Sequence, residues 1–204
     1  MGYKIFALAG TRMKIGLYFG TFNPIHVGHL AIANHMVENA DLDQVWMVVT
    51  PLSPFKKKSS LLANHHRLEM VYLATESYDK LQPSDIEFGL PEPNYTVYTL
   101  ANLEEKYPQH EFSLLMGEDN LKGFHKWKNY EAILDNYNLY VYPRISEGTV
   151  EYQLKNHPRI TRVAAPIMEI SSTMIRKSIV AQKNIRPLLD IKVWQFIDEM
   201  NFYK

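Results

Sequence analysis

Cysteine is absent from the 204 residues of this chain. Its absence excludes disulfide bonds, metal sites built on thiolates and cysteine nucleophiles. A net charge is also missing, because 22 Lys and Arg residues balance 22 Asp and Glu residues. Nothing in that balance indicates bulk binding to nucleic acid or to a membrane surface. An anionic small molecule would need only a local cluster of cations.

Long apolar runs, internal repeats, low-complexity tracts and interdomain linkers are missing as well. No apolar segment approaches the roughly 20 residues that cross a bilayer. Residues 1–12 are mildly apolar, but their apolar part is too short for a signal peptide and no convincing cleavage site follows. We therefore interpret residues 1–12 as an N-terminal extension and residues 13–204 as a single domain, and expect a cytoplasmic location.

Strand-like apolar segments alternate with helical patterns along the chain. Strands are expected at 15–19, 45–49, 111–116, 138–142 and 160–164, with a less regular one at 81–88 that Pro83 interrupts. Helices are expected at 29–38, after a cap at Asn64, at 95–107, 129–136 and 172–182, and from Pro187 onward. This alternation predicts an α/β fold, a Rossmann-like, doubly wound and mainly parallel sheet with helices on both faces. Ligands of such sheets bind at the carboxyl ends of the strands.

The segment GTFNPIHVGHL, residues 20–30, links the first expected strand to the first expected helix. Gly20 lets the backbone approach a ligand closely, and the start of a helix attracts anions through its N–H groups and dipole. His26 and His29 are placed where a polyphosphate would sit, and Gly28 between them leaves room for a bulky ligand. A glycine turn alone, or a histidine cap alone, is a weak signal. The combination predicts a phosphate-binding site.

A second polar segment, ISSTMIR at residues 170–176, follows the last expected strand and opens a helix. Serine and threonine at a helix start commonly cap it, and we expect capping here too. Arg176 lies one turn into the helix and can reach back to the same anion with N–H donors that suit phosphate.

Together the two segments resemble the HxGH and ISSTxIR motifs of the nucleotidyltransferase superfamily. The strongest resemblance is to bacterial nicotinate-nucleotide adenylyltransferases, which carry a GTFxPxHxGH pattern; Asn23 stands where many members have Asp. The resemblance covers nearly the whole chain from Met13. It implies that ATP is bound by Gly20, Thr21, Phe22, His26, His29, Gly117, Asp119, Ser171, Ser172 and Arg176.

In that set, Gly117 and Asp119 come from the segment MGEDNL at residues 116–121, which resembles the family motif GxDxL. An Asp after a strand could simply cap a helix. The resemblance implies that Gly117 and Asp119 lie beside the adenosine ribose, and a carboxylate is suited to accept hydrogen bonds from ribose hydroxyls.

Residues for the second substrate are implied by two other segments. In FHKWK, residues 124–128, the polar neighbours of Trp127 suggest a partly exposed ring rather than core packing. The resemblance implies that Trp127 stacks on the pyridine ring of nicotinate mononucleotide, and that Lys128 offers its backbone N–H to the carboxylate. The segment NYTVYTL resembles SYTxxTL, with Asn94 in place of Ser, and implies that Tyr95 and Thr96 lie near the same carboxylate; a capped helix start is compatible with this.

Two basic positions complete the resemblance. SPFKKK at residues 53–58 resembles PPHK, with Phe55 in place of His, and only Lys56 is carried over as a catalytic cation. HHRLEM at residues 65–70 matches HRxxM, which implies that Arg67 orients the loop before it rather than contacting substrate.

The implied activity is transfer of AMP from ATP to nicotinate mononucleotide, giving nicotinic acid adenine dinucleotide and pyrophosphate, a late step of NAD biosynthesis. A phosphate nucleophile is already ionised, so catalysis requires alignment and charge stabilisation, by His26, His29, Lys56 and Arg176, rather than a general base. Mg²⁺ is expected, bound mainly through the ATP phosphates, and no protein metal site is expected.

Other readings stay open. The acceptor could be nicotinamide mononucleotide or phosphopantetheine, although the family of phosphopantetheine enzymes usually has Thr in place of the first motif histidine, here His26. A nucleotide-binding sensor without turnover is a further alternative. The sequence leaves the oligomeric state undecided, a homo-oligomer included.

Overall fold

The computed structural model describes residues 11–54, 61–145 and 152–204. Lys56 and most of the expected extension, residues 1–12, lie outside the described residues. The same holds for part of the loop that precedes Arg67.

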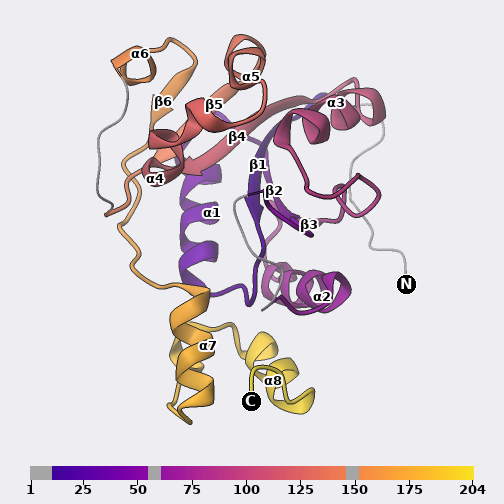
Figure 1. Ribbon diagram of the computed structural model, residues 1–204, viewed down its shortest axis with the longest axis vertical. Helices are drawn as coiled ribbons and strands as arrows, with labels where there is room; N and C mark the ends of the chain where they lie inside the picture. The colour runs from indigo at the N-terminus through magenta and orange to yellow at the C-terminus, as the bar shows by residue number, and fades with distance from the viewer. Residues whose placement is uncertain (1–10, 55–60, 146–151) are drawn as a thin grey trace.

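Within these described ranges, six strands form one parallel sheet in the order β3-β2-β1-β4-β5-β6 (Figure 1). The strands are β1 (Lys14–Gly20), β2 (Gln44–Val49), β3 (Leu81–Ser84), β4 (Glu111–Gly117), β5 (Asn138–Tyr142) and β6 (Ile160–Arg162). The central strands β1, β2 and β4 are almost continuously apolar, as strands covered on both faces are. Pro83 is tolerated because β3 is an edge strand, where a missing backbone N–H breaks no ladder on the outer side.

Helices cover both faces of the sheet, so the predicted doubly wound α/β fold is confirmed. The longer ones are α1 (Val27–Asn39), α2 (Asn64–Thr75), α3 (Thr96–Lys106), α5 (Tyr130–Asn136), α7 (Ser172–Val180) and α8 (Ile191–Glu199). Shorter turns are α4 (Glu118–Lys122), α6 (Tyr152–Lys155) and the 3₁₀ helices η2 (Phe124–Lys126) and η3 (Arg186–Leu188). One core cluster joins the sheet to α1, α2, α7 and α8, and a second joins it to α3, α4 and α5.

The strand order reverses at β1, which pairs with β2 on one side and β4 on the other. At such a point the connections leave the sheet in opposite directions and open a crevice at the carboxyl ends of the strands. The segment with the two motif histidines runs from the end of β1 into α1, directly at this crevice.

Three local predictions need correction. The last strand ends at Arg162, short of residue 164, and β6 pairs only with β5. Asn64 is the first residue of α2 rather than its cap, and its Oδ1 accepts a hydrogen bond from Arg67 instead. Pro187 belongs to the separate turn η3, whereas α8 starts after Asp190, whose carboxylate accepts from the backbone N–H of Lys192 at 2.8 Å.

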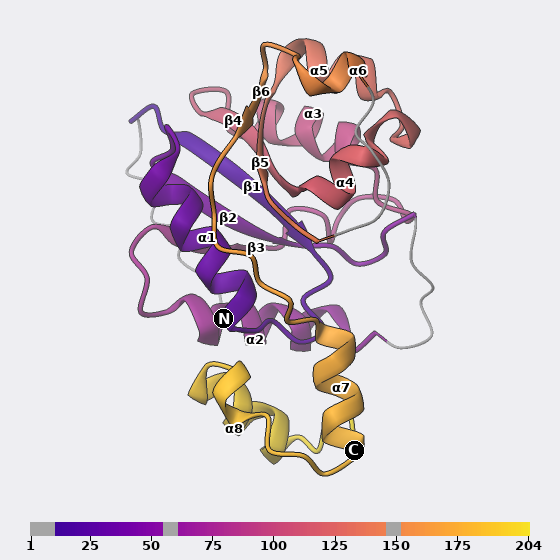
Figure 2. The same cartoon turned by 90° about the vertical axis from the view of Figure 1, so that its left-hand side faces the viewer.

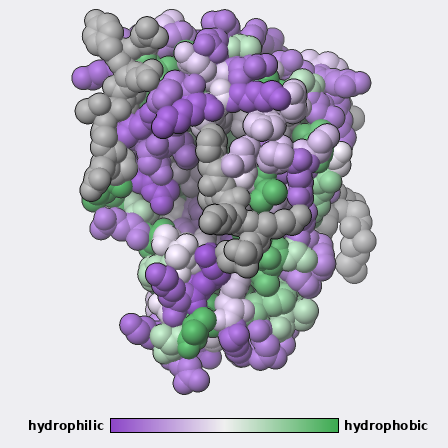
Figure 3. Space-filling view, viewed as in Figure 1, coloured by the Kyte–Doolittle hydropathy of each residue, from purple (hydrophilic) through white to green (hydrophobic). Residues whose placement is uncertain are grey.

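Helices α7 and α8 lie together at one end of the molecule, beyond the sheet and next to α2 (Figures 1 and 2). The face shown in Figure 3 is predominantly hydrophilic, with hydrophobic residues in small separate groups. Within the described residues, none of the helices is both long enough and apolar enough to cross a membrane.

Candidate active site

One pocket brings together the two sequence motifs that lie at opposite ends of the chain. It has a volume of about 590 Å³ and lies at the carboxyl edge of the sheet. We call it the histidine pocket; its lining includes His26, Gly28, His29, Ser171, Ser172 and Arg176. The residues implied for ATP phosphates therefore converge from α1 and α7, although about 140 positions separate the two helices in the sequence.

Direct hydrogen bonds tie the late helix to the early turn. Arg176 Nη1 donates to the carbonyl oxygen of Asn23 at 2.8 Å, and Ser172 Oγ donates to the carbonyl oxygen of Pro24 at 2.9 Å. Ser171 caps α7 as expected, since its Oγ accepts from the N–H of Met174 at 3.2 Å. These bonds fix the position of the Arg176 guanidinium relative to the two histidines.

The histidines themselves are held in a defined state. The backbone N–H of His26 donates to Nδ1 of His29 at 3.2 Å, so a neutral His29 carries its proton on Nε2, as a donor. Burial, together with the positive charge of Arg144, lowers the pKa of His26 to about 4. His26 is therefore neutral at physiological pH, and any phosphate contact it makes is a hydrogen bond rather than an ion pair.

Sequence reasoning missed part of this pocket. Tyr18 on β1 and Tyr142 on β5 line it with their hydroxyl groups 3.1 Å apart, and Arg144, two residues after the end of β5, lines it too. Burial raises the pKa of both tyrosines, which keeps the hydroxyls protonated. The position of Arg144 at the carboxyl end of a strand was a usable signal, because polar residues there converge on the crevice.

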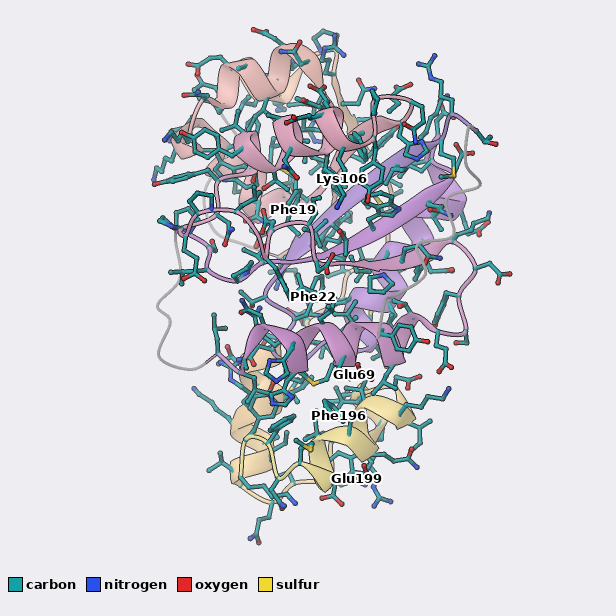
Figure 4. All side chains as sticks on the ribbon, turned by 90° about the vertical axis from the view of Figure 1, so that its right-hand side faces the viewer. Phe19, Phe22, Glu69, Lys106, Phe196 and Glu199 are labelled. Atoms are coloured by element: carbon teal, nitrogen blue, oxygen red, sulfur yellow. The ribbon has the colours of Figure 1, made fainter. Side chains whose placement is uncertain are left out.

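Two glycines make room for neighbouring rings of the same turn. A Cβ on Gly20 would lie 2.8 Å from Cζ of Phe22, so the glycine makes room for that ring. A Cβ on Gly28 would lie 3.0 Å from Nδ1 of His26, so the lack of a side chain at Gly28 makes room for the His26 imidazole. The Phe22 side chain is 1% exposed and does not line the histidine pocket; it lies between the sheet and α2 (Figure 4). The implied contact between Phe22 and ATP stays a prediction.

Gly117 and Asp119 lie beside the histidine pocket and are not among the residues that line it. Asp119 connects to it through Arg144, whose Nε is 3.8 Å from the carboxylate Oδ2. The other carboxylate oxygen, Oδ1, is buried without a hydrogen-bond partner among the described residues. A buried acceptor of this kind is available to a hydroxyl donor.

A second, smaller pocket adjoins the first. It has a volume of about 210 Å³, and the two share Thr21. We call it the tryptophan pocket; Gly20, Tyr95, Thr96, Trp127 and Lys128 all line it. The ring of Trp127 is partly exposed, as its polar neighbours indicated, and its inner side packs near Phe124 with the ring centroids 5.2 Å apart. Every described residue implied for the second substrate is thus in this one pocket.

Cations and a buried carboxyl group define the electrostatics of the tryptophan pocket. Lys128 Nζ lies 4.7 Å from the ring centroids of both Tyr95 and Tyr98, and a hydrogen bond to Tyr98 raises the pKa of this lysine. Glu87 is 1% exposed, and burial raises its pKa although Thr99 donates to it at 2.6 Å. Its burial favours the neutral acid, which repels an anionic ligand less than a carboxylate would.

Arg67 and Asn94 support the pockets from positions outside the histidine pocket. Asn94 also lines the tryptophan pocket. Arg67 is fully buried and donates to the carbonyl oxygens of Leu62, Thr21, Thr50 and Pro51 and to Oδ1 of Asn64. Asn94, which replaces the usual Ser, exchanges two hydrogen bonds with the backbone of Leu52. Arg67 therefore orients the turn and the loop, as its motif implied.

Comparisons with known proteins agree with this geometry. The family model described as cytidylyltransferase-like matches residues 17–178. A probable nicotinate-nucleotide adenylyltransferase of Christiangramia forsetii is 69% identical over 94% of this chain and 98% of its own length. One from Flavobacterium johnsoniae is 68% identical over 94% of this chain and its entire length.

Solved structures show the same fold. The nicotinic acid mononucleotide adenylyltransferase of Plasmodium falciparum, in complex with NaAD, superposes with a TM-score of 0.79 over 94% of this chain and 98% of its own, at 21% identity. Its complex with APC gives a TM-score of 0.78 with the same coverage. With two close relatives covered almost end to end, the chain belongs to the nicotinate-nucleotide adenylyltransferase family of cytidylyltransferase-like proteins.

Proposed function

We propose that this protein transfers AMP from ATP to nicotinate mononucleotide, releasing pyrophosphate and forming nicotinic acid adenine dinucleotide. The observation that carries the proposal is the junction of the two pockets at Thr21. A triphosphate in the histidine pocket and a mononucleotide in the tryptophan pocket would present their phosphate groups to each other there. The names of relatives that are up to 69% identical support the same activity.

The chemistry is an in-line displacement. An oxygen of the acceptor's 5′-phosphate forms a bond to the α-phosphorus of ATP, and the bond from that phosphorus to the β-bridging oxygen breaks. The electron pair leaves with pyrophosphate, and no proton has to be removed from the nucleophile. Alignment of the two phosphates and stabilisation of the charge on the leaving group are what the site must provide.

His26, His29 and Arg176 line the pocket where this charge gathers, and we assign them hydrogen bonds and ion pairs to the triphosphate. Ser171 and Ser172 lie at the start of α7, where the helix dipole favours an anion. Arg144 adds a second guanidinium to the same pocket. Lys56, which lies outside the described residues, keeps its proposed role as a further cation.

Mg²⁺ is proposed to accompany ATP, held by phosphate oxygens and water. Among the described residues there is no group of three or more His, Asp or Glu side chains arranged to hold a metal ion, and the charged side chains lining the histidine pocket are arginines, which bind phosphate rather than metal. When bound, the ion would neutralise part of the charge on the phosphates. We also propose a cytoplasmic location, where ATP is available.

Pyrophosphate release tests the proposal. Purified protein is mixed with ATP, Mg²⁺ and, in separate reactions, nicotinate mononucleotide, nicotinamide mononucleotide or phosphopantetheine. Fast release with the nicotinate compound and slow release with the others is the expected result. Preference for another acceptor would reassign the substrate, and ATP binding without release in any reaction would indicate a sensor.

A further inference from the structure

Three donors from outside hold the turn that carries the two motif histidines, in addition to the bond from the His26 N–H to His29 within it. Arg67 binds the carbonyl oxygen of Thr21 at 2.7 Å, Arg176 binds that of Asn23 and Ser172 binds that of Pro24. Each donor comes from a different part of the chain or from a separate position on α7. The placement of His26, two residues after Pro24, depends on these contacts.

The side chain of Asn23 has its own pair of donors. Its Oδ1 accepts from Tyr203 Oη at 2.8 Å and from the backbone N–H of Leu62 at 3.2 Å. Asn23 is 1% exposed, so these bonds are shielded from competing water. Tyr203 is 180 positions away in the sequence, in the segment that follows α8.

Ser172 and Arg176 line the histidine pocket, so a bound triphosphate would compete for their donors. Tyr203 is not among the residues lining either pocket. Its hydrogen bond to Asn23 can therefore persist while substrate binds and leaves. This makes it a fixed support, unlike the contacts of Ser172 and Arg176.

The segment around Tyr203 is built to keep its hydroxyl in place. Tyr203 has a φ of 64°, a left-handed conformation that a residue with a side chain adopts only when its surroundings impose it. The preceding Phe202 packs against His66 of α2, with 4.8 Å between ring centroids, and against Phe196 of α8, which lies between α8 and α2 (Figure 4). Burial raises the pKa of Tyr203 far above its ordinary value, so the hydroxyl stays a donor.

We infer that Tyr203 is a positioning residue for the reaction, acting through Asn23 to hold the turn that presents His26 and His29 to the triphosphate. This inference rests on the proposed function for its kinetic consequences. The placement of the His26 and His29 imidazoles by the Tyr203 hydroxyl does not depend on which reaction the protein catalyses.

The kinetic test uses Tyr203→Phe, which removes one oxygen and keeps the ring. We expect kcat to fall about tenfold, with KM for the mononucleotide within about twofold of wild type, because small misplacement affects the transition state most. Asn23→Ala should lower kcat at least as much, because it also removes the acceptor of the Leu62 N–H. Asn23→Asp keeps an acceptor oxygen, and its kcat should fall less. In the double variant Tyr203→Phe with Asn23→Ala, the effects should not multiply, since both changes remove the same hydrogen bond from Tyr203 Oη to Asn23 Oδ1.

The control is Tyr72→Phe, a matched change on an exposed ring of α2 that lines neither pocket. It should keep wild-type kcat. All rates are measured well below the midpoint of thermal unfolding of each variant, so that a merely less stable protein still shows normal kcat. A wild-type kcat in Tyr203→Phe, or effects that multiply in the double variant, would overturn the inference.

A spectroscopic experiment tests this inference separately from the proposed function. In protein with isotope-labelled histidine, Tyr203→Phe should shift the imidazole resonances of His26 and His29 and leave those of His35 and His110 in place. This readout needs no turnover. Unchanged His26 and His29 resonances refute the positioning role even in an active enzyme, whereas shifted resonances in a protein without pyrophosphate release refute only the proposed function.

Discussion

The imidazole rings of His26 and His29 stack with their centroids 3.7 Å apart and their planes inclined by 27°. Phe22 and Tyr18 make T-shaped contacts with the ring of His29, at centroid distances of 5.1 Å and 6.1 Å. Because the backbone N–H of His26 also donates to Nδ1 of His29, the ring of His29 is fixed in both position and tautomer. Such preorganisation is what transition-state stabilisation requires.

Replacement of His29 by alanine should therefore lower kcat by roughly 100-fold or more, because a donor aimed at the developing charge is lost. Steady-state kinetics with saturating ATP and nicotinate mononucleotide gives the value. His35→Ala, on the same helix but lining neither pocket, is the matched control and should behave as wild type. A near-normal kcat in His29→Ala would remove His29 from the reaction.

The stability of the protein should depend on pH through His26. Above pH 6.5 the imidazole is neutral in the folded and the unfolded state, so it does not make the free energy of unfolding depend on pH. Between pH 6.5 and the folded-state pKa of about 4, the unfolded chain binds a proton that the folded protein does not, so stability falls as pH falls. The full effect is about 3 kcal/mol.

Urea denaturation at several pH values measures this slope. His26→Asn, which does not titrate, should lose less free energy of unfolding than wild type between pH 6.5 and 4. Parallel curves for the two proteins would mean that His26 titrates normally in the folded state.

Much of this arrangement is accessible from sequence because it is local. Apolar runs followed by polar turns predict the strands. The segments at residues 20–30 and 170–176 each follow an expected strand, so their place at the carboxyl edge of the sheet can be predicted too. The contacts that were not predicted are long-range. The hydroxyl pair of Tyr18 and Tyr142 and the bond from Tyr203 to Asn23 join segments 124 and 180 positions apart. No periodicity or capping rule specifies which tyrosine meets which partner.

Two further features of the site depend on short-range contacts that residue propensities do not show. Asn64 has the composition of a cap, but the guanidinium of Arg67 takes its side-chain oxygen. Phe22 lies inside the ligand-binding motif, yet its φ of 43° directs the ring under Gly20 and into the core. In both cases the partner is only two or three positions away in the sequence, but the folded turn and helix decide that the two residues meet, and no capping rule specifies it.

Arg67 supports the frame of both pockets, and its removal should be strongly destabilising. Arg67→Met leaves four backbone carbonyls and the Asn64 side chain without their shared donor in a buried site. We expect a loss of about 3–5 kcal/mol in the free energy of unfolding by denaturant titration. Arg12→Met breaks an exposed ion pair with Glu111 and should change stability by less than about 1 kcal/mol. Equal losses in the two variants would contradict the role assigned to Arg67.

Trp127 offers a test of which pocket holds which substrate. Trp127→Ala should raise KM for nicotinate mononucleotide several-fold more than KM for ATP, because the ring lines only the tryptophan pocket. Trp194→Ala, on α8 and lining neither of the two substrate pockets, is the comparison. Equal changes in both KM values for Trp127→Ala would count against stacking on the acceptor.

Lys128 should contribute to binding of nicotinate mononucleotide through its charge rather than through packing. Its Nζ lies over the rings of Tyr95 and Tyr98 in the lining of the tryptophan pocket. An exposed cation attracts an anionic acceptor only while salt does not screen it. Lys128→Met should therefore raise KM for nicotinate mononucleotide about threefold to tenfold at low ionic strength, and the difference from wild type should shrink by 0.5 M salt. Lys106→Met, which removes a lysine near Tyr107 outside the pocket, should leave KM unchanged at either ionic strength. A salt-independent rise in KM for Lys128→Met would mean that the side chain acts by filling space, because only an electrostatic contribution fades as the Debye length shortens.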